Sequence, residues 1–312
     1  MSATNVWALG ALVVGGSSTF TLKGVEQRQH DTGDDEIEVM AGGQPYPSFV
    51  TSMQAAPKKT MTVLDIATLL GNVSPIAGLA LPTSTTYTTL DTYYTALSDG
   101  GLRKGASSHM KVRANKAMIV LNSITANQGQ RATAEITVYT TFDGTNAPFV
   151  YTTGVSLPST PAVDELFTMG PVTINGTLLT DVTSVKIDFN PQMKVIASDS
   201  DLYPSFCGIM TMSPKITVST NDVAALNTYG LTGTAINTSG TNFYLKAMTN
   251  MGTQVANAST AHIKFALSNS QGKVYTGSFG GSNTDNSTGT IIIQPIAGSS
   301  TILSTTTGVA IT

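Results

Sequence analysis

The sequence contains one long pattern twice, and this repeat limits the possible folds more than any other feature. Tyr46-Pro47-Ser48-Phe49 recurs as Tyr203-Pro204-Ser205-Phe206, and 11 of the 24 residues in 46–69 are identical to those 157 positions later. Composition alone would give roughly one or two identities in such a window. We therefore expect two homologous domains in tandem, residues 1–156 and residues 157–312.

Shorter matches extend the repeat toward both ends of each half. At an offset of 160, residues 9–16 match residues 169–176, and Gly24-Val25 is placed opposite Ser184-Val185. At offsets of 153 and 154, residues 107–112 match 260–265 and residues 152–155 match 306–309. The changes of offset indicate loops of unequal length between conserved strands of the unit.

Composition excludes several classes of protein. Cys207 is the single cysteine of the chain, so an intrachain disulfide is impossible. Charged residues make up only 11% of the sequence and the net charge is −3, without the clustered basic face of a nucleic-acid reader. The apolar stretch 6–14 is too short to cross a bilayer and has no basic residue before it. We expect neither a membrane segment nor a signal peptide.

Alternating apolar and polar residues predict a mainly β fold, with a β-sandwich or barrel in each half. Patterns of period two, typical of half-buried antiparallel strands, occur at residues 36–39, 110–113, 135–139, 184–189 and 263–265. Turn signals separate the strands at Gly15-Gly16, Gly42-Gly43, Asp99-Gly100-Gly101, Asp143-Gly144, Asn175-Gly176 and Gly280-Gly281.

Each half is also expected to contain one short flanking helix. Thr62-Val63-Leu64-Asp65 and Ser219-Thr220-Asn221-Asp222 fit an N-terminal capping pattern in which the hydroxyl accepts from a backbone amide. Gly71 and Gly230 are expected to end these helices, and the repeated Tyr-Pro-Ser-Phe segment to fix the approach of the chain to them. The apolar stripes predicted at helical spacing are Ile66, Leu69 and Leu70 in the first half and Val223, Leu226 and Tyr229 in the second.

No catalytic, phosphate-binding or dinucleotide-binding motif is present in the sequence. His109 and His262 occupy equivalent positions at the start of predicted strands, without a carboxylate or cysteine at ligand spacing, so we expect structural roles for both. Cys207 replaces Val50 and is expected to be a buried, inert thiol. Trp7 is expected to pack in the core. We predict no enzymatic activity, no cofactor, and no catalytic, cofactor-binding or metal-binding residue.

Asp31-Thr32-Gly33-Asp34-Asp35-Glu36 is the densest run of charge in the sequence. Its carboxylates could hold a hard cation such as Ca²⁺ or contact another subunit. The run has no counterpart in the second half and falls where the offset between the halves changes from 160 to 157. A solvated loop tip is therefore the favoured interpretation.

Three segments resemble the tail-tube proteins of long-tailed bacteriophages. They are residues 57–69, Ser108-His109-Met110-Lys111 and Phe142-Asp143-Gly144-Thr145-Asn146-Ala147-Pro148, and the first two are repeated at 214–226 and 261–264. The resemblance implies a β-sandwich with a flanking helix in each unit. It also implies rings of six units whose inner strands form one barrel around a DNA channel. A chain with two units would then form homotrimeric rings with pseudo-sixfold symmetry.

The resulting hypothesis is a virion structural protein, assembled in the cytoplasm of the host bacterium, whose stacked rings form the tail tube. Its partners would be further copies of itself, other tail proteins and the viral DNA, which passes through the channel without specific binding. A weakly acidic chain suits such passage because it avoids phosphate binding. Two other hypotheses remain open: a double jelly-roll capsid protein and a tandem surface-binding module.

Overall fold

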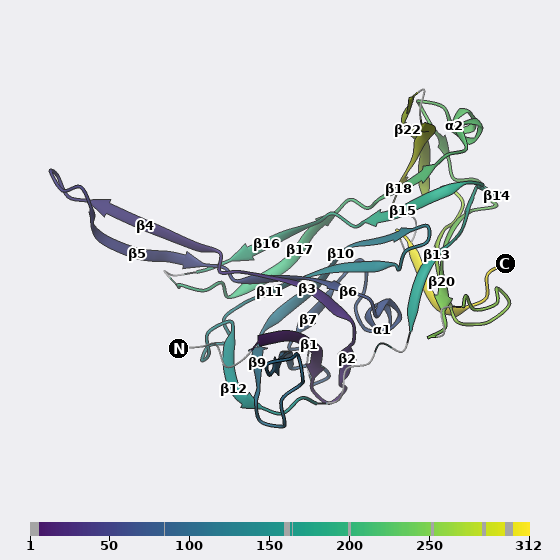
Figure 1. Ribbon diagram of the computed structural model, residues 1–312. Helices are drawn as coiled ribbons and strands as arrows, with labels where there is room; N and C mark the ends of the chain where they lie inside the picture. Colours follow the sequence, from purple (N-terminus) through teal and green to yellow (C-terminus); the bar gives the residue numbers. More distant parts are fainter. Residues whose placement is uncertain are drawn as a thin grey trace.

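The computed structural model describes residues 6–83, 85–158, 163, 165–198, 201–250, 253–282, 285–296 and 302–312. The predicted mainly β fold is confirmed, with antiparallel strands throughout the described chain and two short helices in it, α1 (Ile66–Asn72) and α2 (Val223–Tyr229) (Figure 1). Two five-stranded sheets, one ten-stranded sheet and two separate two-stranded hairpins make up the molecule.

The two five-stranded sheets have corresponding strand orders. The first-half sheet is β12 (Val150–Val155), β9 (His109–Ala114), β8 (Thr89–Leu97), β1 (Val6–Gly15) and β2 (Phe20–Leu22). The second-half sheet is β24 (Ser304–Val309), β21 (His262–Leu267), β20 (Thr241–Met248), β13 (Leu166–Ile174) and β14 (Thr177–Leu178). Even their irregularities agree, because the β1–β8 register shifts between Leu9 and Leu12 and the β13–β20 register shifts between Met169 and Val172.

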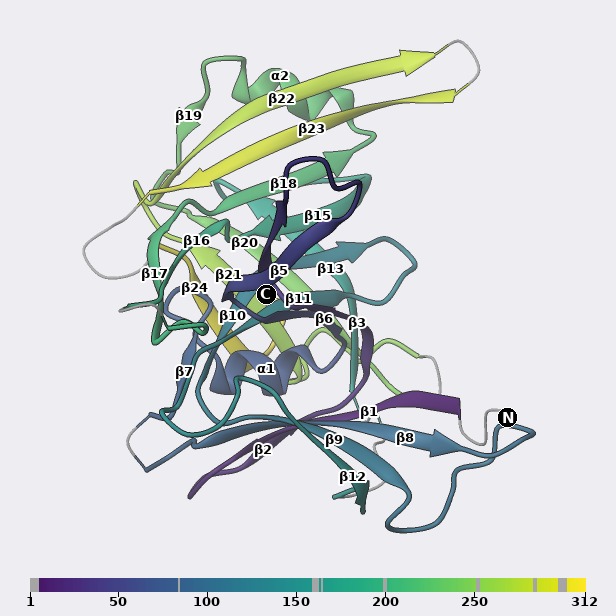
Figure 2. The same cartoon turned by 90° about the vertical axis from the view of Figure 1, so that its left-hand side faces the viewer.

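The ten-stranded sheet runs through both halves (Figure 2). The first half contributes β3 (Val25–Asp31), β6 (Lys58–Val63), β11 (Thr133–Thr140), β10 (Ala117–Asn127) and β7 (Leu79–Leu81). The second half contributes, in the same order, β15 (Val182–Asp188), β18 (Lys215–Thr220), β23 (Asp285–Pro295), β22 (Gly272–Ser282) and β19 (Thr234–Ala235). Pairing of β10 with β15 joins the two sets, so the sheet does not stop at the boundary between the halves.

A single hydrophobic core accompanies this continuous sheet. Buried residues from Leu12 near the N-terminus to Leu303 near the C-terminus belong to one cluster. Phe167 and Phe189 of the second half are fully buried in it. Trp7, which we expected in the core, instead lies at the start of β1 with 41% of its surface exposed.

Strand pairing corrects the alignment of the two halves. Val25 pairs with Val63, whereas Val182 pairs with the counterpart Thr220, so Val25 corresponds to Val182 and not to Val185. The three extra residues of the first half therefore lie between β1 and β3, because the offset is 160 in β1 and 157 from Val25 to Leu69. Likewise, the Gly280-Gly281 turn prediction is wrong, since both glycines lie inside the long strand β22.

Both helices form at their predicted places, but the predicted cap is wrong. Asp65 and Asp222 are themselves the N-caps, and their carboxylates accept from backbone amides of the first turn, while Thr62 and Ser219 still belong to the preceding strands. Gly230 follows α2 with a positive φ of 60°, as predicted. Gly71 lies inside α1, which ends at Asn72.

The repeated Tyr-Pro-Ser-Phe segment does not lead into the helices. It lies in two hairpins, formed by β4 (Asp34–Met40) with β5 (Pro47–Ala55) and by β16 (Pro191–Ile196) with β17 (Phe206–Met212). A full strand, β6 or β18, separates each hairpin from its helix. The β4–β5 hairpin, called the arm below, leaves the body of the molecule at the left of Figure 1. Proline at a hairpin end costs no ladder hydrogen bond there.

Candidate functional site

The two equivalent histidines have the structural role that we predicted. His109 Nδ1 accepts from the Ala96 amide at 3.0 Å, and His262 Nδ1 accepts from the Ala247 amide at 3.0 Å. Both rings are buried, and His262 Nε2 lies 3.0 Å from the Ala256 carbonyl oxygen. Burial, with a further contribution from the Arg103 charge, lowers the pKa of His109. Each imidazole therefore bonds the backbone of the neighbouring strand, which is a structural role.

Cys207 and the acidic run offer no reactive centre. Cys207 is half-buried and not fully buried as we expected. Its partial burial raises the pKa of the thiol to about 11, so a thiolate does not form near neutral pH. Asp31 accepts from the Gly33 amide and pairs with Lys58 at 3.2 Å, which together lower its pKa. The acidic run spans the end of β3 and the start of β4, at the base of the arm, so its assignment to a loop tip is wrong. Within the described ranges, no three metal-ligating side chains come together.

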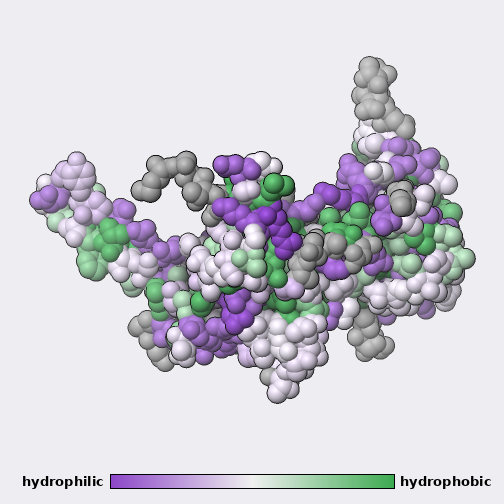
Figure 3. Space-filling view, turned by 60° about the horizontal axis from the view of Figure 1, so that its bottom comes forward, coloured by the Kyte–Doolittle hydropathy of each residue, from purple (hydrophilic) through white to green (hydrophobic). Residues whose placement is uncertain are grey.

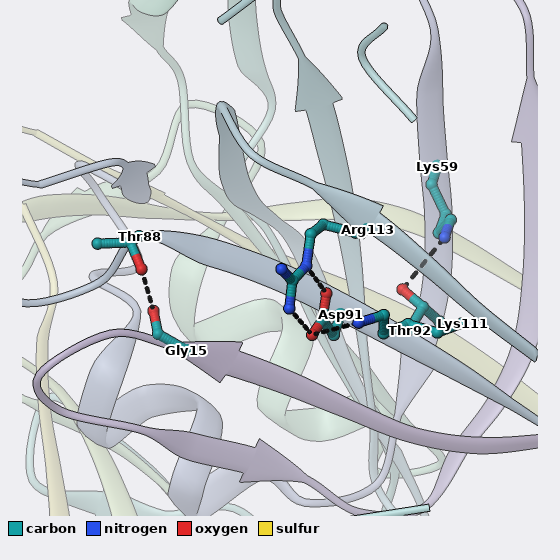
Figure 4. Close-up of polar contacts among 7 residues, drawn as sticks. All are labelled: Gly15, Lys59, Thr88, Asp91, Thr92, Lys111 and Arg113. Carbon is teal, nitrogen blue, oxygen red and sulfur yellow. Dashed lines mark hydrogen bonds and ion pairs between the residues drawn. The ribbon is translucent and has the colours of Figure 1, made fainter. Parts of the chain in front are cut away.

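A charged network that our sequence reasoning missed lies in the five-stranded sheet of the first half (Figure 4). Asp91 and Arg113 are directly opposed in β8 and β9, and two 2.7 Å contacts join carboxylate and guanidinium. Lys111 Nζ lies 3.8 Å from the same carboxylate. Nearby, the fully buried Lys59 donates to Thr92 Oγ1 at 3.1 Å. The sequence could have predicted this ion pair, because the alternation in β8 and in β9 places charged side chains on one face of each strand.

This network belongs to the first half alone. The strand register places Asn242 and Ala266 at the positions of Asp91 and Arg113. The halves thus share a backbone but differ in charged side chains. Asp91 is the one carboxylate of this group and is satisfied by two contacts with Arg113, so we interpret the group as an ion pair between neighbouring strands.

A cleft of about 540 Å³ lies where the halves meet. Gln128, Arg131, Phe167, Thr168 and Met248 are among the residues around it. Among the described residues that line it, Arg131 is the titratable one, and its guanidinium pairs with Glu26 at 2.7 Å. The described lining of the cleft therefore consists mainly of apolar side chains and side-chain amides.

The described part of the ten-stranded sheet has unpaired strand edges to which another chain could bind. In the described chain, no strand pairs with the outer edge of β3, and β19 covers only the Lys273–Val274 part of β22. These edges are at the two ends of the ten-stranded sheet. Unpaired backbone amides and carbonyls at such edges are templates for pairing with another chain.

The arm adds an exposed apolar surface next to the β3 edge. Residues 31–50 are all exposed, including the large apolar side chains of Ile37, Val39, Met40, Tyr46 and Phe49. Figure 3 shows apolar residues gathered on this projecting hairpin. Exposed apolar patches of this kind mark contact surfaces between proteins.

Comparison with known proteins identifies no family for this chain. A search against protein-family models gives no match, and a search of curated proteins gives no relative with significant similarity. Among the described residues, no helix is both long and apolar enough to cross a bilayer. The functional conclusion therefore rests on the repeat, the sheet and its edges.

Proposed function

We propose that this chain is the structural subunit of a bacteriophage tail tube. Three copies form a ring with pseudo-sixfold symmetry, and stacked rings enclose a channel through which the viral DNA passes. In this proposal the chain is not an enzyme and binds no cofactor, and its partners are further copies of itself and other tail proteins.

One observation carries the proposal. The first-half strands β3-β6-β11-β10 and the second-half strands β15-β18-β23-β22 have the same order, and they join edge to edge through β10 and β15. The same join can recur between chains, because β22 corresponds to β10 and β3 corresponds to β15. A contact that joins unlike edges generates a ring if its rotation closes. The sequence resemblance to tail-tube proteins supports a ring of this kind.

The sheet that crosses the middle of the chain favours a tube over a double jelly roll. Two jelly rolls close their sheets within each half, and the lattice then depends on side-to-side packing. Here the β10–β15 ladder of five residue pairs makes the halves one sheet with two available ends. A continuous inner wall suits a channel for DNA.

Electron microscopy of the purified chain at rising concentration tests the proposal. We expect hollow rods built from stacked rings, with light scattering showing trimers or their multiples. Flat or icosahedral lattices would instead support the capsid hypothesis. A protein that stays monomeric at high concentration, without rods, would refute the tube.

A further inference from the structure

Some apolar positions are buried in the first half, where the second half covers them, but exposed at the matching positions of the second half. Ile124 of β10 is 2% exposed, whereas its counterpart in β22, Phe279, is 60% exposed. Ile66 of α1 is 0% exposed, whereas its counterpart Val223 of α2 is 37% exposed. The second half thus displays apolar side chains at the positions that the first half covers with its neighbour.

The two hairpins show the complementary difference. In β16 the burial alternates, and Tyr203 and Pro204 beside β17 are half-buried and buried, respectively. Main-chain contacts seat this hairpin on the first half, since Pro204 accepts from the Phe142 amide at 2.7 Å and Ser205 accepts from Lys116 Nζ at 2.8 Å. The arm has the same motif with every residue exposed, so it lacks the equivalent surface to lie on.

Charge distinguishes the arm from its counterpart. The less exposed face of β16 consists of Pro191, Met193 and Val195. Pairing of β4 with β5 and of β16 with β17 places Asp34, Glu36 and Glu38 at these positions in the arm. An apolar face in one hairpin is therefore an acidic face in the other.

The strand surface on which β16 and β17 lie also differs between the halves: it is apolar in β10, whereas β22 carries a lysine at the matching position. Met118 and Val120 are buried on the face of β10 opposite the main core, and both β16 and β17 contact this strand. The matching positions in β22 are Lys273, which is exposed, and Tyr275. An acidic arm facing a lysine is complementary, whereas an acidic arm on Met118 and Val120 would bury unpaired carboxylates.

We propose that the arm of one copy lies on β22 and β23 of a second copy, with its acidic face toward Lys273. In the same contact, β3 pairs with β22 in the register of the β10–β15 join, which places Gln29 opposite Gly280. This inference rests on the proposed function, because it assumes that copies of the chain assemble. It goes further by naming the surfaces and the interaction that selects between chains.

The exchange of apolar for charged residues gives the contact its specificity. The join within the chain covers the apolar side chains of Met118, Val120 and Ile124 and forms once, during folding. The join between chains is charged, so it weakens as salt screens the pair, with a screening length of about 10 Å at 0.1 M salt. The arm is also kept off the first-half surface of its own or another chain, because its carboxylates would lose water there without gaining partners.

Charge reversal tests the acidic contact. Glu36→Lys and Lys273→Glu should each raise the protein concentration needed for assembly by about tenfold or more, because each places like charges in contact. The double variant should return within about threefold of the wild type, since the pair is restored with its sign reversed. Arg103→Glu, an exposed reversal in the first-half loop after β8, is the matched control and should leave assembly unchanged.

Cysteine cross-linking tests the register. In a Cys207→Val background, Gln29→Cys with Gly280→Cys should give covalent dimers and trimers on mild oxidation, because directly opposed strand residues lie within disulfide range. Gly280 has no heavy atom within 4 Å of an added Cβ, so the substitution fits. Gln29→Cys with Phe279→Cys is the control, because a shift of one residue directs the thiols to opposite faces.

The outcomes separate the two proposals. Rods that form without the Gln29–Gly280 cross-link, or that are indifferent to both charge reversals, would overturn this contact and leave the tube intact. A wild-type chain that never assembles would overturn both. Cross-linking with rescue by the double variant would establish the contact, whichever particle is seen.

Discussion

The first half should not fold into a stable monomer when residues 1–156 are expressed alone. Truncation removes β15, and with it the five residue pairs that cover Ser123–Asn127 of β10. It also removes β16 and β17 from the face of β10 that carries Met118 and Val120. The truncated sheet therefore ends in an unpaired, apolar edge strand of the kind that aggregates.

The size of the loss follows from burial. Met118, Val120 and Ile124 are at most 7% exposed in the whole chain. Exposing a buried side chain of this size costs about 1.5–3 kcal/mol, so the three together cost about 5–9 kcal/mol. A domain of this length has roughly 5–15 kcal/mol of stability in total, and the truncation removes a large part of it.

Size-exclusion chromatography with light scattering, followed by urea unfolding, measures this effect. We expect residues 1–156 to elute as aggregates or to unfold without a cooperative transition. Adding Ile124→Lys to the fragment should improve its solubility, since a lysine on an edge strand opposes pairing. A soluble monomeric fragment that unfolds cooperatively, within about 2 kcal/mol of the whole chain, would refute this reasoning.

Three further predictions concern stability. Gly170→Ala should destabilise the chain by about 1–3 kcal/mol in urea unfolding, because the new Cβ would lie 2.7 Å from the Tyr244 carbonyl oxygen; an unchanged midpoint would contradict this. Asp91→Asn should cost about 1–3 kcal/mol, since it leaves Arg113 without its carboxylate, and adding Arg113→Ala, which copies the second half, should recover most of the loss. Stability should fall as pH drops below about 6.5, because the lowered pKa of His109 keeps it neutral when folded while the unfolded chain takes up the proton; in His109→Gln, thermal unfolding should show a smaller loss between pH 7 and 5.

The local pattern of the sequence is enough to predict the strands, the helices and the structural role of the two histidines. Period-two alternation at 135–139 and 263–265 found strands of both kinds of sheet, because each has one face on the core. The same alternation failed for burial at 36–39, where β4 lies in the arm and both faces are exposed. The Thr62 cap failed because Thr62 pairs with Glu135 of β11 and so belongs to β6, which continues to Val63.

The repeat itself, visible in the sequence alone, determined that two similar units would occur. Only the tertiary structure decided that β10 and β15 join them into one sheet, because strand pairing over long distances leaves no local signature in either strand. The same holds for Tyr-Pro-Ser-Phe. The four residues of this segment are exposed in the arm of the first half, whereas in the second half Tyr203 packs against Phe142. The burial of identical residues therefore depends on the neighbours that the fold places beside them.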